Sequence, residues 1–221
     1  MDAILQQFFN IEIMAKAMPL VLKGLGMTLL ICAVVIPLGA LGGLAAALGS
    51  VSHNRLIRWS AIAFVDLFRA LPPLVLLIFI YAGLPFAGIR LSPFAAVTLG
   101  FFLNNSAYFA EIFRAGLLSV PVGQTEAARS TGMTATQTLI WVTLPQAVRN
   151  VLPDLLSNVV EIVKLTSLAS VVSLGEMLHA AGLVRSLTYN ASPLVLAGGI
   201  YLLLLWPLIR LISHFERRIA S

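Results

Sequence analysis

The chain has 221 residues, of which 59% are hydrophobic and only 10% charged, and its net charge is +5. Soluble domains carry about 25% charged residues, so this composition excludes an ordinary soluble globular protein. The single cysteine excludes an intrachain disulfide, and the three histidines are scattered without metal-ligand spacing, so we expect no metal site. The basic residues lie mainly in short segments between apolar stretches, and we expect no nucleic-acid partner.

The first element is an N-terminal segment, about residues 1–18. Asp2, Glu12 and Lys16 interrupt its apolar residues, and no basic region precedes a compact apolar core. This pattern does not fit a cleavable signal peptide. It favours a short helix lying at the membrane interface.

Long apolar stretches follow. Four of them run for about 20 residues or more without Asp, Glu, Lys or Arg, and a helix of that length crosses a hydrocarbon core of roughly 30 Å. A further apolar segment carries three charges. We therefore expect one all-α polytopic domain in the lipid bilayer, with five transmembrane helices at about 19–48, 57–84, 92–118, 151–177 and 190–213.

Two of these helices contain special residues. Gly39 and Gly43 of the first have GxxxG spacing, which permits close helix packing in lipid. The partner is either another helix of this chain or a second subunit. Pro72 and Pro73 fall inside the second helix, where proline removes a backbone donor and kinks a helix.

The distribution of Lys and Arg predicts the orientation, because these residues gather on the cytoplasmic side. With the N-terminus outside, eight of them face inward and four outward. The inner set is Arg55, Arg58, Arg114, Arg129, Arg149, Arg210, Arg217 and Arg218, and the outer set is Lys16, Lys23, Arg90 and Arg185. The sequence therefore predicts an N-out, C-in protein whose segment 119–150 is cytosolic.

That cytosolic segment is rich in small residues and is compatible with helix. Pro121 is suited to a helix start, residues 124–129 favour helix, and Gly132 interrupts it. Residues 134–143 allow a second helix up to Pro145. We expect two short helices with a glycine elbow, forming a stiff structure that a partner can push. An ordinary amphipathic connector is the alternative.

Several motifs along the chain point to one family. The cytosolic segment has Glu126-Ala127-Ala128, then Gly132, then Leu144-Pro145, which resembles the EAA loop of ABC importer permeases. Flanking segments resemble motifs of the same family: Phe68-Arg69-Ala70-Leu71-Pro72, Tyr108–Arg114, and Lys164-Leu165-Thr166-Ser167-Leu168. Together they cover roughly residues 20–215 and resemble the amino-acid permeases of the histidine/glutamine type, in a type I importer fold.

The resemblance implies a transport subunit and not an enzyme, in the bacterial inner membrane. It implies two ABC ATPase subunits, a second permease subunit and an extracytoplasmic amino-acid-binding protein as partners. This chain has no phosphate-binding loop, so ATP and Mg would bind the partner ATPase. The substrate would be a polar amino acid or a close derivative such as an opine. Glu126, Ala127, Ala128, Gly132, Leu144 and Pro145 would couple the chain to the ATPase.

Charges within the expected spans cost about 2.5–3.5 kcal/mol each at a helix centre, so they need partners or a function. Glu161 and Lys164 are three residues apart, which suits an ion pair. Alternatively they line the substrate path, where Lys164 would meet a carboxylate. The candidate path residues are Asn105, Asn158, Glu161, Lys164, Thr166 and Ser167. Asp66 with Arg69, and Glu111 with Arg114, are candidate structural or gating pairs.

One departure from the family pattern bears on the assembly. Leu165 stands where the family usually has an aspartate that would meet the substrate ammonium. Either Glu161 takes over this role, or the chain is the non-binding half of a heterodimer, which we favour slightly over a homodimer. An ion-coupled secondary transporter using Glu161 and Lys164, and a scaffold subunit, are the rival functions.

Overall fold

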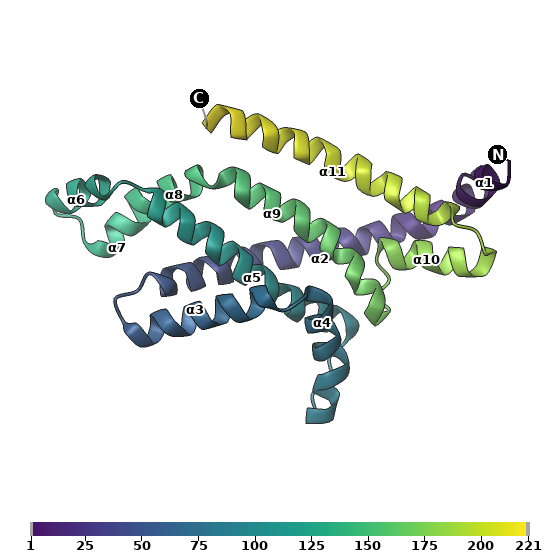
Figure 1. Cartoon of the computed structure of the whole chain (residues 1–221), viewed down its shortest axis with the longest axis horizontal. Helices are drawn as coiled ribbons and strands as arrows, with labels where there is room; N and C mark the ends of the chain where they lie inside the picture. The colour runs from purple at the N-terminus through teal and green to yellow at the C-terminus, as the bar shows by residue number, and fades with distance from the viewer. Residues whose placement is uncertain (1, 220–221) are drawn as a thin grey trace. The chain divides into compact units, whose positions relative to one another are not determined.

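The computed structural model describes residues 2–219, and the side chains of residues 3–213 within that range. Arg217 and Arg218, which contributed to the predicted orientation, have side chains outside this range. Figure 1 shows a series of helices of very different lengths. Their bounds are α1 (Asp2–Phe8), α2 (Ile11–Ser50), α3 (Arg55–Ala70), α4 (Pro73–Ile78), α5 (Pro93–Ser119), α6 (Val122–Ser130), α7 (Ala135–Thr138), α8 (Leu144–Asn150), α9 (Leu152–Leu165), α10 (Met177–Thr188) and α11 (Ser192–Ile219). Short π-helical turns cover Phe79–Gly83 and Leu139–Thr143, and 3₁₀ turns cover Leu84–Ala87 and Thr166–Val172.

Three helical stretches among the described residues are long and apolar enough to cross a membrane: Ala3–Ser50, Leu152–Val172 and Ser192–Ser213. Arg55–Ala70 and Pro73–Ala87 make a fourth if they are counted as one broken span. Helix α5 has 27 residues, but polar residues at 104–106 lower its hydropathy. The structure therefore supports an all-helical membrane protein with three or four apolar spans. Helix α5 is the only candidate for the expected fifth span among the described residues, and its length is the one property that favours this assignment.

The helix that contains the first predicted span begins earlier than the span itself. Helix α2 starts at Ile11, so residues 11–18 are continuous with the long helix. Asn10 explains this start, because its side-chain oxygen accepts a hydrogen bond of 3.1 Å from the Ile13 backbone N–H. Such caps satisfy the free N–H groups of a first turn.

The two prolines in the second predicted span break the helix instead of only kinking it. Leu71 and Pro72 both have extended backbone, with ψ of 126° and 130°, and α4 starts at Pro73. The residue before a proline is driven out of the helical region, and here two successive residues precede a proline. The span is thus two helical pieces, α3 and α4.

The chain divides into two compact units, each described here by itself. The first contains the chain up to Ile36, residues 72–101 and residues 160–210. Its core includes Ala17, Val21, Met177, Ala181 and Ala197, which belong to α2, α10 and α11. Ala17, Ala181 and Ala197 place one small side chain on each of these helices, which lets them pack closely.

The second unit contains residues 37–71, 102–159 and the C-terminal residues from Leu211. In it the glycine face of α2 packs on α5. A Cβ placed on Gly43 would lie 2.4 Å from the Phe109 Cβ, and one on Gly39 would lie 3.3 Å from the Asn105 Cβ. The GxxxG pair therefore serves packing within the chain, which was one of its two predicted uses.

Candidate functional site: the coupling segment and its neighbours

The segment after α5 folds into the predicted pair of short helices around a glycine elbow. Helix α6 ends at Ser130, and Gly132 has a φ of +90°, a backbone conformation that side chains other than glycine rarely adopt. The Gly132 N–H donates to the Arg129 carbonyl at 3.1 Å, and the Met133 N–H donates to the Ala128 carbonyl at 3.4 Å. These two bonds form the Schellman motif, the usual glycine-dependent helix ending.

The next helix has its own start signal. The Thr134 side chain accepts from the Gln137 N–H at 3.3 Å, while the Gln137 side chain accepts from the Thr134 N–H at 2.8 Å. This reciprocal arrangement is a capping box. Both sides of the elbow are therefore held by their own residues.

The second helix does not stop at Pro145 as predicted. The π-helical turn over Leu139–Thr143 makes the Leu144 N–H donate to the Leu139 carbonyl, and Pro145 then occupies the first turn of α8. Proline has no N–H to donate, so the helix passes this position without a hydrogen bond from residue 145. The helix continues to Asn150.

Helix α8 is attached to the end of α5, which fixes the base of the segment. The Asn150 amide donates to the Ser119 hydroxyl at 2.8 Å. A Cβ on Gly116 would lie only 2.7 Å from the Ala147 carbonyl oxygen, so the two backbones approach closely. These two contacts join the end of the segment to the end of α5.

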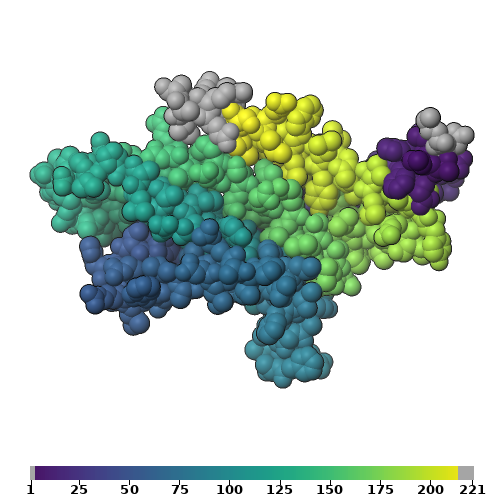
Figure 2. Space-filling model, in the orientation of Figure 1, coloured from purple at the N-terminus to yellow at the C-terminus, as the bar shows by residue number. Residues whose placement is uncertain are grey.

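Among the predicted coupling residues, Ala128 is buried, whereas Glu126, Ala127, Gly132 and Pro145 are exposed and Leu144 is half-buried. In Figure 2 this part of the chain, teal near residue 125, lies uncovered at the surface. We call residues 122–150 the coupling segment. Its exposed residues include one carboxylate, several small side chains, the large side chain of Trp141 and the turn at Gly132.

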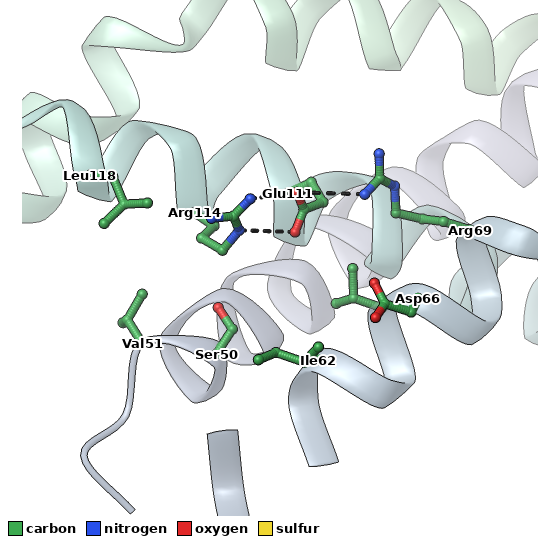
Figure 3. Close-up of a pocket in the computed structure, with 9 residues that line it drawn as sticks. Ser50, Val51, Ile62, Asp66, Arg69, Glu111, Arg114 and Leu118 are labelled. Atoms are coloured by element: carbon green, nitrogen blue, oxygen red, sulfur yellow. Dashed lines mark hydrogen bonds and ion pairs between the residues drawn. The ribbon is translucent and has the colours of Figure 1, made fainter. Parts of the chain in front are cut away.

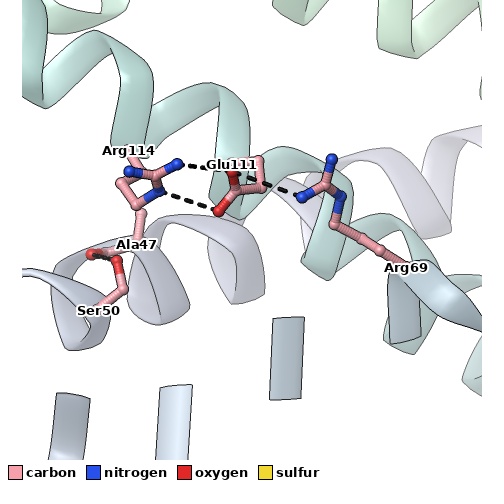
Figure 4. Close-up of polar contacts among 5 residues, drawn as sticks. All are labelled: Ala47, Ser50, Arg69, Glu111 and Arg114. Atoms are coloured by element: carbon pink, nitrogen blue, oxygen red, sulfur yellow. Dashed lines mark hydrogen bonds and ion pairs between the residues drawn. The ribbon is translucent and has the colours of Figure 1, made fainter. Parts of the chain in front are cut away.

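A network of ionic contacts joins α3 to α5 in the same unit (Figure 4). Arg114 donates to both oxygens of Glu111, at 3.0 Å from Nε and 2.8 Å from Nη2. Arg69 approaches Glu111 more loosely, at 3.5 Å, and its guanidinium lies 5.8 Å from the centre of the Tyr108 ring. The expected Glu111–Arg114 pair thus forms, and Arg69 pairs with Glu111 and not with Asp66.

The structure separates the predicted path residues into two environments. Asn158 and Thr166 are buried, whereas Glu161 and Lys164 are exposed and form an ion pair with each other. The Thr166 and Ser167 hydroxyls donate to backbone carbonyls of the preceding turn, those of Val163 and Lys164.

The two predicted path asparagines differ from each other. Asn105 is buried and has an interaction partner. Within the described residues, the Asn158 amide nitrogen is buried without a hydrogen-bond partner, so it is an unused donor.

Sequence reasoning missed a buried polar group near the start of α10. Glu176 is fully buried, and its two oxygens accept from the Leu178 and His179 N–H groups at 2.7 and 2.6 Å. The Met177 N–H donates to Thr28 at 3.3 Å, which ties this helix start to α2. The signal was available, because an ionisable residue next to a membrane span needs an explanation.

Comparisons with known proteins agree with this geometry. Residues 36–221 match the family described as "Binding-protein-dependent transport system inner membrane component". The probable amino-acid ABC transporter permease YckA of Bacillus subtilis is 38% identical over 81% of this chain and 79% of its own length. The probable glutamine ABC transporter permease GlnM of the same organism is 33% identical over 96% of this chain and 99% of its own length.

A solved structure shares both fold and sequence. The crystal structure of an amino acid ABC transporter with histidines contains a chain that superposes with a TM-score of 0.84 at 36% identity, over 93% of this chain and 96% of that one. This protein therefore belongs to the family of ABC importer permeases, with a type I permease fold. It is an inner-membrane transport component and not an enzyme, and members of the family work with a separate ATPase and a binding protein.

Proposed function

We propose that this chain is the membrane-spanning subunit of an importer for polar amino acids or close derivatives such as opines. The names of the relatives support the substrate class, since they are amino-acid and glutamine permeases. The substrate would arrive on an extracytoplasmic binding protein. The observation that carries the mechanism is the exposed coupling segment, with its glycine elbow and its attachment to the end of α5.

In this mechanism the chain spans the membrane five times, N-out and C-in, with α5 as the third span and the coupling segment in the cytosol. Two ABC ATPase subunits bind ATP and Mg and dock on the coupling segments. Their closure moves α5 through the Asn150–Ser119 and Gly116–Ala147 contacts. The spans then change from inward-open to outward-open, and hydrolysis resets them.

The substrate path would run beside α9. The buried, unpartnered Asn158 amide supports this proposal, because an unused buried donor in a native protein needs a ligand, a water or a partner. Glu161 and Lys164 satisfy each other, so we propose no ion-coupling role for them. Leu165 supports a heterodimer in which the second permease subunit carries the ammonium-binding carboxylate.

The coupling proposal is tested by replacing Glu126 with lysine. Wild-type protein extracted in detergent is expected to co-purify with an ATPase subunit, whereas Glu126→Lys should lose that subunit or its stimulated activity, because the exposed carboxylate is reversed. The matched control is Glu12→Lys, which reverses an exposed carboxylate outside the coupling segment. The measurement is the identity of all co-purifying chains together with ATPase activity.

Absence of an ATPase from well-folded wild-type protein would contradict the coupling role and would make Glu161 the next residue to examine for proton coupling. Equal loss of the ATPase in both variants would show a charge effect unrelated to the coupling segment. A second permease chain in the wild-type sample would establish the heterodimer, and its absence would favour the homodimer.

A further inference from the structure

A charged cavity in the second unit is not used by the coupling mechanism. It has a volume of about 430 Å³ and lies between the end of α2, the second half of α3 and the last turns of α5. Figure 3 shows Asp66, Arg69, Glu111 and Arg114 around it, together with apolar side chains. Small-molecule sites in proteins have volumes of about 300–1,000 Å³ with a few convergent polar groups, and this cavity fits that description.

The four charged side chains around the cavity differ in how many of their hydrogen-bonding atoms already have a partner. Arg114 binds both oxygens of Glu111 at 3.0 and 2.8 Å, so these two side chains already neutralise each other. Arg69 contacts Glu111 only at 3.5 Å, and a guanidinium has five N–H donors. Most donors of Arg69 are therefore available to a ligand.

Asp66 supplies the opposite charge. It precedes Arg69 by three residues on α3, so the two side chains are neighbours on one face of the helix, and Figure 3 shows both at the cavity. Within the described residues, no hydrogen bond or ion pair involves the Asp66 carboxylate, since Arg69 is directed to Glu111 instead. The cavity thus offers one cation with free donors beside one free carboxylate.

We propose that this cavity binds a zwitterion, with the anionic group on Arg69 and the ammonium group on Asp66. A simple anion would be repelled by Asp66, and a simple cation by Arg69 and Arg114, whereas a zwitterion satisfies both. A free α-amino acid has this chemistry, and so does the headgroup of phosphatidylethanolamine. Resting on the proposed function, the cavity faces the cytosol, because Arg114 lies near the end of α5, which stops at Ser119 just before the coupling segment begins at residue 122.

In that orientation a ligand enters the cavity from the cytosol, which is the side on which an importer releases its substrate. A bound amino acid would contact α3 and α5 at once, and α5 is the helix that the coupling segment moves. Accumulated product would therefore oppose the movement of α5 and slow further import. The site is distinct from the proposed path beside α9.

The test uses the assembled transporter in phosphatidylcholine nanodiscs and equilibrium binding of radiolabelled L-glutamine and L-arginine. Asp66→Asn and Arg69→Gln should each weaken one saturable binding component at least tenfold. Asp66→Glu should restore it, because the carboxylate is kept. The matched controls are Asp154→Asn and Arg55→Gln, which alter exposed charges outside the cavity and should leave that component unchanged. Glutaramate, which lacks the α-amino group, should not compete.

A second arm distinguishes the two sources of the zwitterion. Native mass spectrometry after addition of phosphatidylethanolamine should show retained lipid that Asp66→Asn releases if the headgroup occupies the site. Identical amino-acid binding and lipid retention in wild type, Asp66→Asn and Arg69→Gln would overturn the proposal. Stimulated ATPase activity, measured on the same samples, separates this outcome from failure of the importer function, because that activity depends on the coupling segment.

Discussion

Replacing Gly132 with alanine is expected to reduce coupled transport by about tenfold, because the left-handed backbone at this position costs a side-chain-bearing residue about 1–2 kcal/mol. The φ of +90° at Gly132 is needed for the Schellman ending of α6, and the strain would shift the elbow toward other shapes. A β-branched residue at this position, as in Gly132→Val, should have a larger effect. The measurement is ATP-dependent amino-acid uptake into proteoliposomes, together with ATPase activity.

The matched control for this prediction is Gly123→Ala. Gly123 lies in α6, the helix that ends just before the Gly132 elbow, it has no positive φ, and a Cβ placed on it has no heavy atom within 4 Å. It should transport as well as wild type. Full coupled uptake by Gly132→Val would show that the elbow shape is not required and would remove the main support for the coupling mechanism.

Replacing Gly43 with alanine is expected to destabilise the protein by about 1–3 kcal/mol, the usual cost of overpacking a tight interior. The new Cβ would lie 2.4 Å from the Phe109 Cβ and 2.9 Å from the Ala110 backbone nitrogen, so α2 and α5 would have to separate. For a chain of this size the midpoint of thermal unfolding in detergent should fall by about 2–12 °C.

Two other glycines of α2 give this prediction a graded control. A Cβ on Gly42 meets the Ser106 hydroxyl at 2.4 Å and the Phe102 ring at 2.9 Å, which are side-chain atoms that can move, so Gly42→Ala should cost less. A Cβ on Gly26 meets no heavy atom within 4 Å, so Gly26→Ala should be neutral or slightly stabilising, since alanine favours helix. Equal melting temperatures for all three variants would contradict the packing of α2 on α5.

The coupling segment was predictable because its shape depends on neighbours in sequence. Pro121 and Gly132 determine where α6 starts and ends through their own backbone preferences, and these rules need no knowledge of distant residues. Pro145 was misjudged because a π-helical turn over Leu139–Thr143 changes the hydrogen bonding just before it. Local rules assume regular helix and do not anticipate such turns.

The remaining features depend on residues far apart in the chain. GxxxG spacing looks the same whether its partner is inside or outside the chain, and only the fold places Gly43 against Phe109. Asp66 and Arg69 have the spacing of an ion pair, yet Arg69 turns to Glu111, which is 42 residues further along. Glu176 was missed because its role involves the start of α10 and a contact from that start to Thr28 in α2.

The capping box at Thr134 and the Schellman ending at Gly132 have one further consequence. Because both helix ends at the elbow are already satisfied by their own residues, the segment is preorganised. A protein that binds it need not order it first, and ordering costs about 0.5–1.5 kcal/mol for each immobilised flexible side chain at an interface. Under the proposed function, an ATPase would therefore dock on a segment whose shape is already formed, and the free energy of binding would not be spent on ordering that segment.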